Sequence, residues 1–384
     1  MGEIVYILKH KNIDVAILNI EGGDVINAVE IKNKEHLPYK YEENMQKNVM
    51  LLNKWIENRG IALSREDHDE IMTRYGVRSS KELTVLSMGL SLSDHYWLCE
   101  EKKEKTWAEV NFYENEFSTR IGEIIAGRAD KDKNIFNPDF SSSGSLRKFW
   151  TIDEGKRYLC KAGSGDLKQE PYNEHIASVI ESGLGIEHVE YNLEEFNGEI
   201  YSKCECMTDK DNEFLNAFMV FLEGDKNKGR YENYIDICSR KGIKNAEEEI
   251  NRMIVLDYMI RNTDRNLNNY GILRNSETLE WVKINPIYDN GNSFWHDTQV
   301  IENIKGKAKS NCKSFLGENE KNLELVKNYE WLDFTKIEGI DKTIEKILKS
   351  NKAMEGLRAE KITIGFNERI MELKKHALLK STYL

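Results

Sequence analysis

A predicted β-hairpin with a polar loop at each end constrains this chain more than any other feature. It lies within residues 262–292 and reads NTDRNLNNYGIL, a short turn, and then WVKINPIYDNGN. The runs 270–274 and 279–284 are β-prone, and the polar residues between them are typical of a turn that joins two antiparallel strands. Residues just before the first strand and just after the second lie at the same open end of such a hairpin. We therefore expect the two polar loops to meet.

Three side chains in these loops are of the kind that phosphoryl transfer from ATP requires. Asp264 and Asn269 lie in the first loop, and Asp289 lies in the second. A carboxylate can accept the proton of a substrate hydroxyl, and amide and carboxylate oxygens can hold Mg²⁺ across the phosphates. We expect Asp264 to be the catalytic base, with Asn269 and Asp289 on the metal. The alternative is that Asn, Asp and Gly are abundant here because turns favour them.

The string NTDRNLNNYGIL followed by PIYDNGNSF resembles the HipA-like serine/threonine kinases of the HipA/CtkA type. Members of that family carry NTD in place of the usual HRD and YD in place of DFG. The resemblance implies an α+β, bilobal protein-kinase-like fold with a small β-rich lobe, a mostly helical large lobe and an N-terminal β-rich subdomain. We expect the subdomain at residues 1–115, the small lobe with its nucleotide lid at 116–207, and the large lobe with the catalytic loop at 208–384.

A glycine-containing loop is the candidate nucleotide lid. Residues 140–146 read FSSSGSL and precede two strand-like runs, 148–152 and 157–161. A loop joined to a hairpin suits a kinase lid, whereas the loop of a P-loop NTPase opens onto a helix, and no GxxxxGK[ST] string occurs. The resemblance implies that ATP contacts Ser142, Ser143, Gly144 and Ser145.

The same loop offers a site for autophosphorylation. HipA-like kinases carry a serine three residues before the lid glycine, which is the spacing of Ser141 to Gly144. Phosphate on Ser141 or Ser143 would add about two negative charges and repel the phosphates of ATP, which would switch the enzyme off. The alternative is an ordinary solvated loop, because serine is common in turns.

A lysine and a glutamate follow the lid in kinase order. Lys161 ends the second strand-like run, and a helix is predicted from Pro171 to a stop at Gly183. In kinases a strand lysine holds the ATP phosphates and pairs with a glutamate of the next helix, so Lys161 and Glu174 are the matching candidates. Glu170 is the alternative candidate for the glutamate that pairs with Lys161. The alternatives are a solvated edge-strand lysine and an acid that complements the helix dipole.

The run IYSKCECM at residues 200–207 suits the last strand of the small lobe and the hinge that receives adenine. Glu205 and Met207 are therefore expected at the nucleotide. Its C-x-C pair is weak support for zinc without a second cluster. The six cysteines share no recurring spacing and no secretory leader precedes them, which indicates reduced thiols in a cytoplasmic protein. No apolar stretch approaches the length of about 20 residues that a membrane span needs.

The N-terminal part is expected to be a small β-meander covered by a helix. Strands are predicted at residues 4–8, 13–20 and 25–31. A helix is predicted over residues 42–58, with an apolar stripe that packs against the strands. The stripe consists of Met45, Val49, Leu52 and Ile56.

The charge of the chain limits its partners. The formal net charge is −11, which disfavours direct nucleic-acid binding because the phosphate backbone requires a positive face. Lysines within residues 303–316 are the best candidates for docking an acidic protein surface, although lysine clusters are usually solvated. The resemblance implies a protein substrate, which in some relatives is a translation component, and a DNA-binding antitoxin as partner.

Two other functions stay open. The D-R-x-x-x-N string at residues 264–269 also resembles phosphoinositide kinases, so a small-molecule or lipid kinase is one alternative. A catalytically silent, ATP-binding pseudokinase module is the other, because a fold does not imply an activity.

Overall fold

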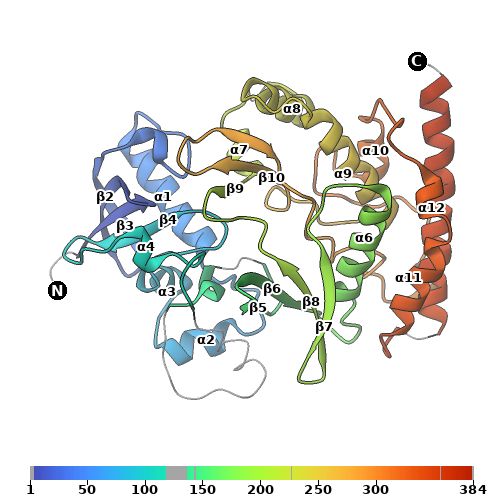
Figure 1. The fold of residues 1–384 in the computed structure, drawn as a ribbon, viewed down its shortest axis with the longest axis horizontal. Coiled ribbons are helices and arrows are strands. Elements are labelled where there is room, and N and C mark those ends of the chain that lie inside the picture. The colour runs from blue at the N-terminus through green and yellow to red at the C-terminus, as the bar shows by residue number, and fades with distance from the viewer. Residues whose placement is uncertain (1–3, 118–135, 142–143, 226, 355, 383–384) are drawn as a thin grey trace. The chain divides into compact units, whose positions relative to one another are not determined.

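The computed structural model describes residues 4–117, 136–141, 144–225, 227–354 and 356–382. The chain divides into two compact units, and each contains antiparallel strands and helices (Figure 1). The first unit comprises Met1–Lys161, Thr208–Phe214 and Arg274–Glu280, and the second comprises Ala162–Met207, Leu215–Leu273 and Trp281–Leu384. The chain is therefore an α+β protein, as expected. The assignment of an N-terminal subdomain and two lobes stays a prediction.

A four-stranded antiparallel sheet of order β3-β2-β1-β4 forms the start of the first unit. Its strands are β1 (Ile4–His10), β2 (Ile13–Glu21), β3 (Asp24–Ile31) and β4 (Tyr96–Glu100). The predicted meander is confirmed, and the strands extend slightly beyond the predicted bounds. Leu8, Val15 and Leu18 are fully buried and form part of its core.

Helix α1 (Met45–Arg59) packs against β3. Leu52 and Ile56 are buried as predicted, but Met45 is 38% exposed, so its assignment to the buried stripe is wrong. The helix begins at Met45 because the side chain of Asn44 caps it by accepting from the N–H of Gln46. Met45 therefore lies in the first turn, at the solvated end of the helix.

Among its described residues, the first unit also contains three short helices and a hairpin. The helices are α2 (His68–Tyr75), α3 (Ser80–Leu86) and α4 (Trp107–Val110). Strands β5 (Lys148–Asp153) and β6 (Lys156–Ala162) pair antiparallel, which confirms the predicted hairpin after the candidate lid. Lys148 lies opposite Lys161 in its register.

The second unit begins with helix α6 (Glu170–Leu184) and the antiparallel hairpin of β7 (Tyr191–Phe196) and β8 (Glu199–Glu205). The helix ends at Gly185, not at the predicted Gly183. Gly185 has a φ of 70°, the left-handed conformation in which its N–H can donate to the last helical carbonyls. A Cβ atom on Gly183 would lie 3.3 Å from Ile337 Cγ2, so this glycine permits close packing inside the helix.

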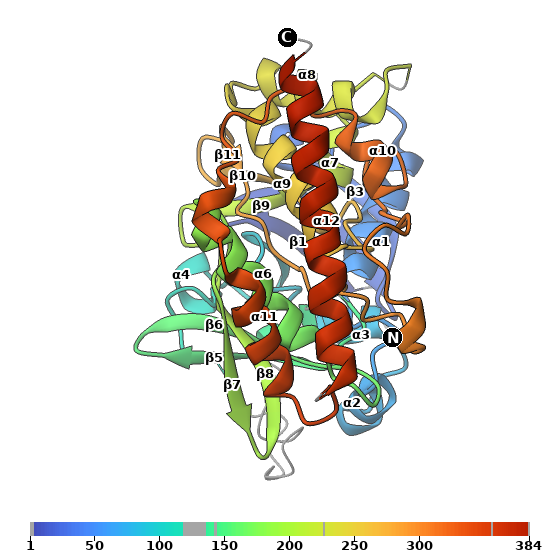
Figure 2. The ribbon, with the colours of Figure 1, turned by 90° about the vertical axis from the view of Figure 1, so that its right-hand side faces the viewer.

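The remaining helices form the core of the second unit. They are α7 (Ala217–Phe221), α8 (Arg230–Arg240), α9 (Ala246–Ile260), α10 (Asn319–Leu323), α11 (Ile340–Lys349) and α12 (Leu357–Thr382). Figure 2 shows α12 as a long helix with α11 packed beside it. Ile176 of α6, Ile254 of α9 and Phe366 of α12 belong to one buried apolar cluster. Among the described residues, no helix combines the length and the apolar composition needed to cross a membrane.

The hairpin that constrains the sequence consists of β10 (Gly271–Asn275) and β11 (Trp281–Ile284). They belong to a three-stranded sheet of order β11-β10-β9, in which β9 is Asn212–Asn216. The buried end of α9 leads into the loop before β10. The predicted strand pair is therefore confirmed, and helix α9 fixes the position at which its first loop begins.

Candidate active site

The loop before β10 is held by the buried side chain of Asn262. Its Nδ2 donates to Asp257 Oδ1 at 3.0 Å, and its Oδ1 accepts from the N–H of Asp264 at 2.9 Å. Helix α9 ends at Arg261, whose φ of 56° turns the chain sharply out of the helix. The residues NTD thus form a structured turn that fixes the backbone of Asp264.

Both carboxylate oxygens of Asp264 are oriented by neighbours. Lys313 Nζ lies 2.6 Å from Oδ1, and Asn292 Nδ2 donates to Oδ2 at 3.0 Å. Asn266 Nδ2 makes a longer contact with Oδ1 at 3.3 Å. The Asp264 side chain is 22% exposed, so a substrate hydroxyl can still reach the carboxylate.

The loops at the two ends of the hairpin meet, as the antiparallel pairing predicts. The N–H of Thr263 donates to Asn292 O at 3.0 Å. The hydroxyl of Tyr288 donates to the backbone oxygen of Asn268. Together with the contact between Asn292 and Asp264, these bonds fasten the second loop to the first.

Asn269 and Asp289, the predicted magnesium ligands, offer the oxygen atoms that this ion prefers. Asn269 Nδ2 donates to Asp264 O at 2.9 Å, and no described residue donates to its Oδ1. Asp289 is half-buried, and its N–H donates to the hydroxyl of Tyr191 at 3.3 Å. Its φ of 59° is left-handed, a strained conformation that non-glycine residues often adopt at functional sites. The two side chains therefore fit a magnesium site chemically.

Arg265 is the fully buried cation at the centre of this region. Its guanidinium forms an ion pair with Asp257 of α9, with Nη2 at 2.9 Å from Oδ1. The same group donates to Asn269 O at 3.0 Å and to Asn290 Oδ1 at 2.6 Å. One arginine thus connects helix α9, the first loop and the second loop.

Side chains of helix α6 hold the second loop, which follows β11. Glu174 Oε2 accepts from the N–H of Asn290 at 2.8 Å, and Asn290 Nδ2 donates to Glu181 Oε1 at 3.3 Å. Burial raises the pKa of Glu181 well above its usual value, although Arg265 and Asn290 lower it in part. A Cβ atom on Gly291 would lie 3.2 Å from Glu170 Cβ, so the loop approaches the helix closely because this residue is glycine.

Lys161 and the lid residues belong to the first unit. Lys161 is 5% exposed at the end of β6, so it is not a solvated edge-strand lysine. Gly144 and Ser145 are exposed, and the hydroxyl of Ser141 donates to Pro138 O at 3.0 Å. Ser142 and Ser143, predicted to contact ATP, lie outside the described residues.

The other predicted nucleotide contacts belong to the second unit. Glu174 is buried on α6 and Glu205 is exposed at the end of β8, while Met207 is half-buried just beyond it. The pairing of Glu174 with Lys161 and the hinge role of Glu205 and Met207 stay predictions.

Sequence reasoning did not identify several residues that build this site. Asn290 directly follows Asp289 and Asn292 lies three residues after it, while Arg265 directly follows Asp264. Their places in the two polar loops could have identified them as candidates. Lys313 is different. It comes from a distant segment, and only the three-dimensional structure brings it to Asp264.

A second polar cluster lies in the first unit. The ligand atoms of His10, His95 and Glu213 are fully buried and lie within 4.8 Å of one another, a set that could hold a metal ion. However, Arg274 Nε donates to Glu213 Oε1 at 2.9 Å, and its positive charge opposes a second cation there. Burial alone would raise the pKa of Glu213, but His10 and Arg274 hold it well below its usual value. This cluster is best described as a structural ion network.

Comparison with known proteins gives structural matches only. No protein-family model matches the sequence, and no curated protein matches it significantly. One similar structure is that of HipA in the Shewanella oneidensis MR-1 toxin–antitoxin system, in complex with HipB and operator DNA. It has 10% sequence identity and a TM-score of 0.50 over 95% of this chain and 96% of that chain. Another is the Helicobacter pylori proinflammatory kinase CtkA, with 18% identity and a TM-score of 0.47 over 62% of this chain and 96% of that chain.

Proposed function

Because this chain has a HipA-like kinase fold, we propose that it is an ATP-dependent serine/threonine protein kinase. The observation that carries the proposal is the site at the open end of the β10–β11 hairpin. There the carboxylate of Asp264 is oriented by Lys313 and Asn292, next to loops that present Asn269 and Asp289. In phosphoryl transfer the protein forms no necessary covalent bond to the substrate. Its main contributions are to position the base and to hold the metal ions.

Asp264 accepts the proton of the substrate hydroxyl as that oxygen attacks the γ-phosphorus of ATP. The bond from the γ-phosphorus to the β,γ-bridging oxygen breaks, and ADP leaves. Asn292 and Lys313 fix the direction of its carboxylate, which limits the geometries in which a hydroxyl can approach. Asn269 Oδ1 and the carboxylate of Asp289 would hold Mg²⁺, which neutralises charge on the phosphates. Arg265 keeps both loops in place through Asn269 O and Asn290 Oδ1.

The remaining nucleotide contacts follow from the resemblance. Lys161 would bind the phosphates and pair with Glu174, the lid residues 142–145 would cover them, and Glu205 and Met207 would receive adenine. Buried Lys161 and Glu174 suit this role better than two solvated groups would. Phosphorylation of Ser141 or Ser143 would add negative charge to the lid and inhibit the enzyme.

The biological partners are also part of the proposal. The HipA structure similar to this chain is bound to HipB and operator DNA. We therefore propose that this chain can act as the toxin of a toxin–antitoxin pair, with a DNA-binding antitoxin as partner and a cytoplasmic protein, such as a translation component, as substrate.

Incubation with γ-labelled ATP and Mg²⁺ tests the substrate class. The purified chain is mixed with a soluble protein extract or, separately, with vesicles that contain inositol lipids. Label in extract proteins with the wild type, and none with the Asp264→Asn variant, is the expected result. Label in lipid alone would establish the lipid-kinase alternative. No label in protein, in lipid or in the small molecules of the extract, together with measurable ATP binding, would establish the pseudokinase alternative.

A further inference from the structure

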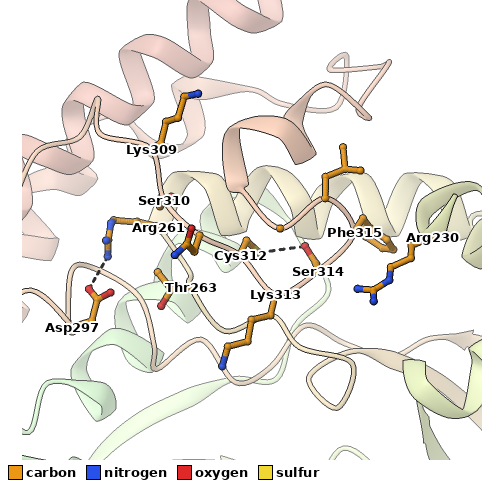
Figure 3. A pocket seen from close by; sticks show the side chains of 13 residues that line it. Arg230, Arg261, Thr263, Asp297, Lys309, Ser310, Cys312, Lys313, Ser314 and Phe315 are labelled. Carbon is orange, nitrogen blue, oxygen red and sulfur yellow. Dashed lines mark hydrogen bonds and ion pairs between the residues drawn. The ribbon is translucent and has the colours of Figure 1, made fainter.

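A pocket of about 810 Å³ in the second unit adjoins the loop before β10, which carries Asp264 (Figure 3). Thr263 of that loop lines it together with Arg230, the first residue of α8, and the segment 309–317. The pocket also includes Lys313, whose amine pairs with Asp264. A group bound here would therefore lie next to the substrate hydroxyl that Asp264 deprotonates.

The pocket is positive although the chain as a whole is negative. Four cationic residues line it, namely Arg230, Arg261, Lys309 and Lys313, against one acid, Asp297. Asp297 already pairs with Arg261 at 2.8 Å. Arg230 and Lys309 form no ion pair with any residue that the structure describes, so their charges remain available to a ligand.

The segment that carries the lysines is held in place. The N–H of Cys312 donates to Gly317 O at 3.0 Å, which closes the segment into a compact turn. Asn322 of α10 then binds it twice, because its Nδ2 donates to Ser314 Oγ at 2.8 Å and its Oδ1 accepts from the N–H of Leu316 at 2.9 Å. Cys312, Ser314 and Phe315 of this segment are themselves buried. Lys313 is therefore presented by a preorganised loop, which distinguishes it from an ordinary solvated lysine run.

Figure 3 shows how the cations are directed. The side chains of Lys313 and Arg230 lie on the same side of the segment, whereas Lys309 points away from them. Arginine offers a planar fork of donors that matches a carboxylate or a phosphate, and lysine offers a point charge. Arg230, which has no ion-pair partner among the described residues, is thus the cation best suited to bind an anion in this pocket, and Lys313 adds positive charge to the same lining.

We propose that this pocket is a specificity subsite for an anionic side chain of the protein substrate, a carboxylate or a phosphate, close to the serine or threonine that is phosphorylated. The proposal rests on the function proposed above and adds a preference for acidic sequences around the acceptor. An extended nucleic acid is disfavoured, because the net charge of −11 repels its backbone outside this one pocket.

Kinetics with a positional peptide set test the preference. Each peptide carries one serine in an alanine-rich background, with one neighbouring position replaced by Asp, Glu or phosphoserine. Wild-type protein is expected to show a kcat/KM about tenfold higher for at least one anionic peptide than for the neutral parent, the gain of one charge-assisted contact. The carboxylate and phosphoserine arms identify the source of the anion.

Matched variants assign the preference to the pocket. Arg230→Gln should reduce the ratio of anionic to neutral kcat/KM about tenfold, chiefly through a higher KM for the anionic peptide. Lys305→Gln removes a lysine from the neighbouring segment that does not line the pocket, and should leave that ratio unchanged. An equal effect of both variants would attribute the preference to general charge and overturn the proposal.

Peptide binding without ATP separates this proposal from the kinase proposal. The preferred anionic peptide is labelled with a fluorophore and titrated with the protein. Wild-type protein should bind it, and the Arg230→Gln variant should bind it more weakly, whether or not phosphate is transferred. Transfer to all peptides at equal rates would refute the subsite while leaving the kinase proposal intact. The subsite would also be refuted if the anionic peptide bound no better than the neutral one. A third refuting result would be displacement of the labelled peptide by an RNA oligonucleotide at a lower concentration than by the unlabelled anionic peptide.

Discussion

Lys313 Nζ lies 2.6 Å from Oδ1 of Asp264, so the carboxylate that would act as base has a cationic partner from a distant segment of the chain. Lys313 is itself 64% exposed. Ion pairs on a surface usually contribute little to stability because water screens them. We therefore expect the Lys313–Asp264 pair to position the carboxylate for catalysis and to contribute little to the stability of the fold.

Replacement of this lysine should slow catalysis without loosening the fold. Lys313→Gln is expected to lower kcat about tenfold, because the Asp264 carboxylate loses its shortest orienting contact, while the midpoint of thermal unfolding stays unchanged. Steady-state phosphate transfer and a melting curve measure the two effects. Lys321→Gln removes a surface lysine paired with Glu318 and serves as the control. An unaltered kcat in Lys313→Gln would show that the pair has no catalytic role.

Arg265 should be essential to stability because of its burial. Arg265→Met leaves the buried carboxylate of Asp257 without its cationic partner and is expected to cost about 3–5 kcal/mol in urea unfolding. The double variant Arg265→Met/Asp257→Leu should regain much of that stability, because both charges are then absent. It should remain inactive, since Asn269 O and Asn290 Oδ1 still lack their donor. A single variant as stable as the wild type would contradict this role.

Glu181 should make the protein less stable at high pH. Burial raises its pKa above the ordinary value of 4.5, so the folded chain binds this proton more tightly than the unfolded chain does. Its favourable contribution is full below pH 4.5 and is lost as the pH rises toward the folded pKa. Glu181→Gln keeps an acceptor for Asn290 without the charge, so it should be more stable than wild type at pH 8 and show a flatter pH dependence. A decline with pH as steep as that of wild type would exclude Glu181 as the cause.

Glu213 in the first unit should behave in the opposite way. Its pKa is held well below 4.5, so its contribution is present above pH 4.5 and is lost only when the pH falls through the folded pKa. Glu213→Gln would leave Arg274 buried without its carboxylate, and we expect a loss of about 3–5 kcal/mol at pH 7. Chemical denaturation of both proteins at pH 7 and at pH 3 measures the difference in their free energies of unfolding. An equal stability of the variant and the wild type at pH 7 would refute the ion network.

The sequence allowed prediction of what depends on neighbouring residues. Alternating apolar residues and turn residues located β1, β2 and β3 to within about two residues. The polar turn predicted at residues 275–278 located the β10–β11 hairpin. The errors arose where a backbone conformation or a capping side chain determines the residue at which a helix begins or ends. Gly183 and Gly185 are both plausible helix ends, and only the positive φ of Gly185 selects one. For Met45, the cap by Asn44 moved the start of the helix.

The site was predictable only within its two loops. Asp264, Asn269 and Asp289 are linked by a hairpin whose strand pairing follows from local sequence. The contacts of Lys313 with Asp264 and of Glu174 with Asn290 join residues far apart in the chain, and no periodicity encodes such tertiary packing. For the same reason, charge patterning identified a lysine-rich segment but did not show which lysine approaches the base.

Phosphate transfer by the Asp264→Asn variant tests the central claim most directly. Asparagine has the same shape but cannot accept the proton, so transfer from γ-labelled ATP to protein should fall by about 10²–10⁴-fold while binding of Mg²⁺-ATP, measured by titration calorimetry, persists. Asp236→Asn changes a half-buried aspartate of α8 whose side chain pairs with Lys228, and it should behave as the wild type does. Transfer by Asp264→Asn at the wild-type rate would contradict the account.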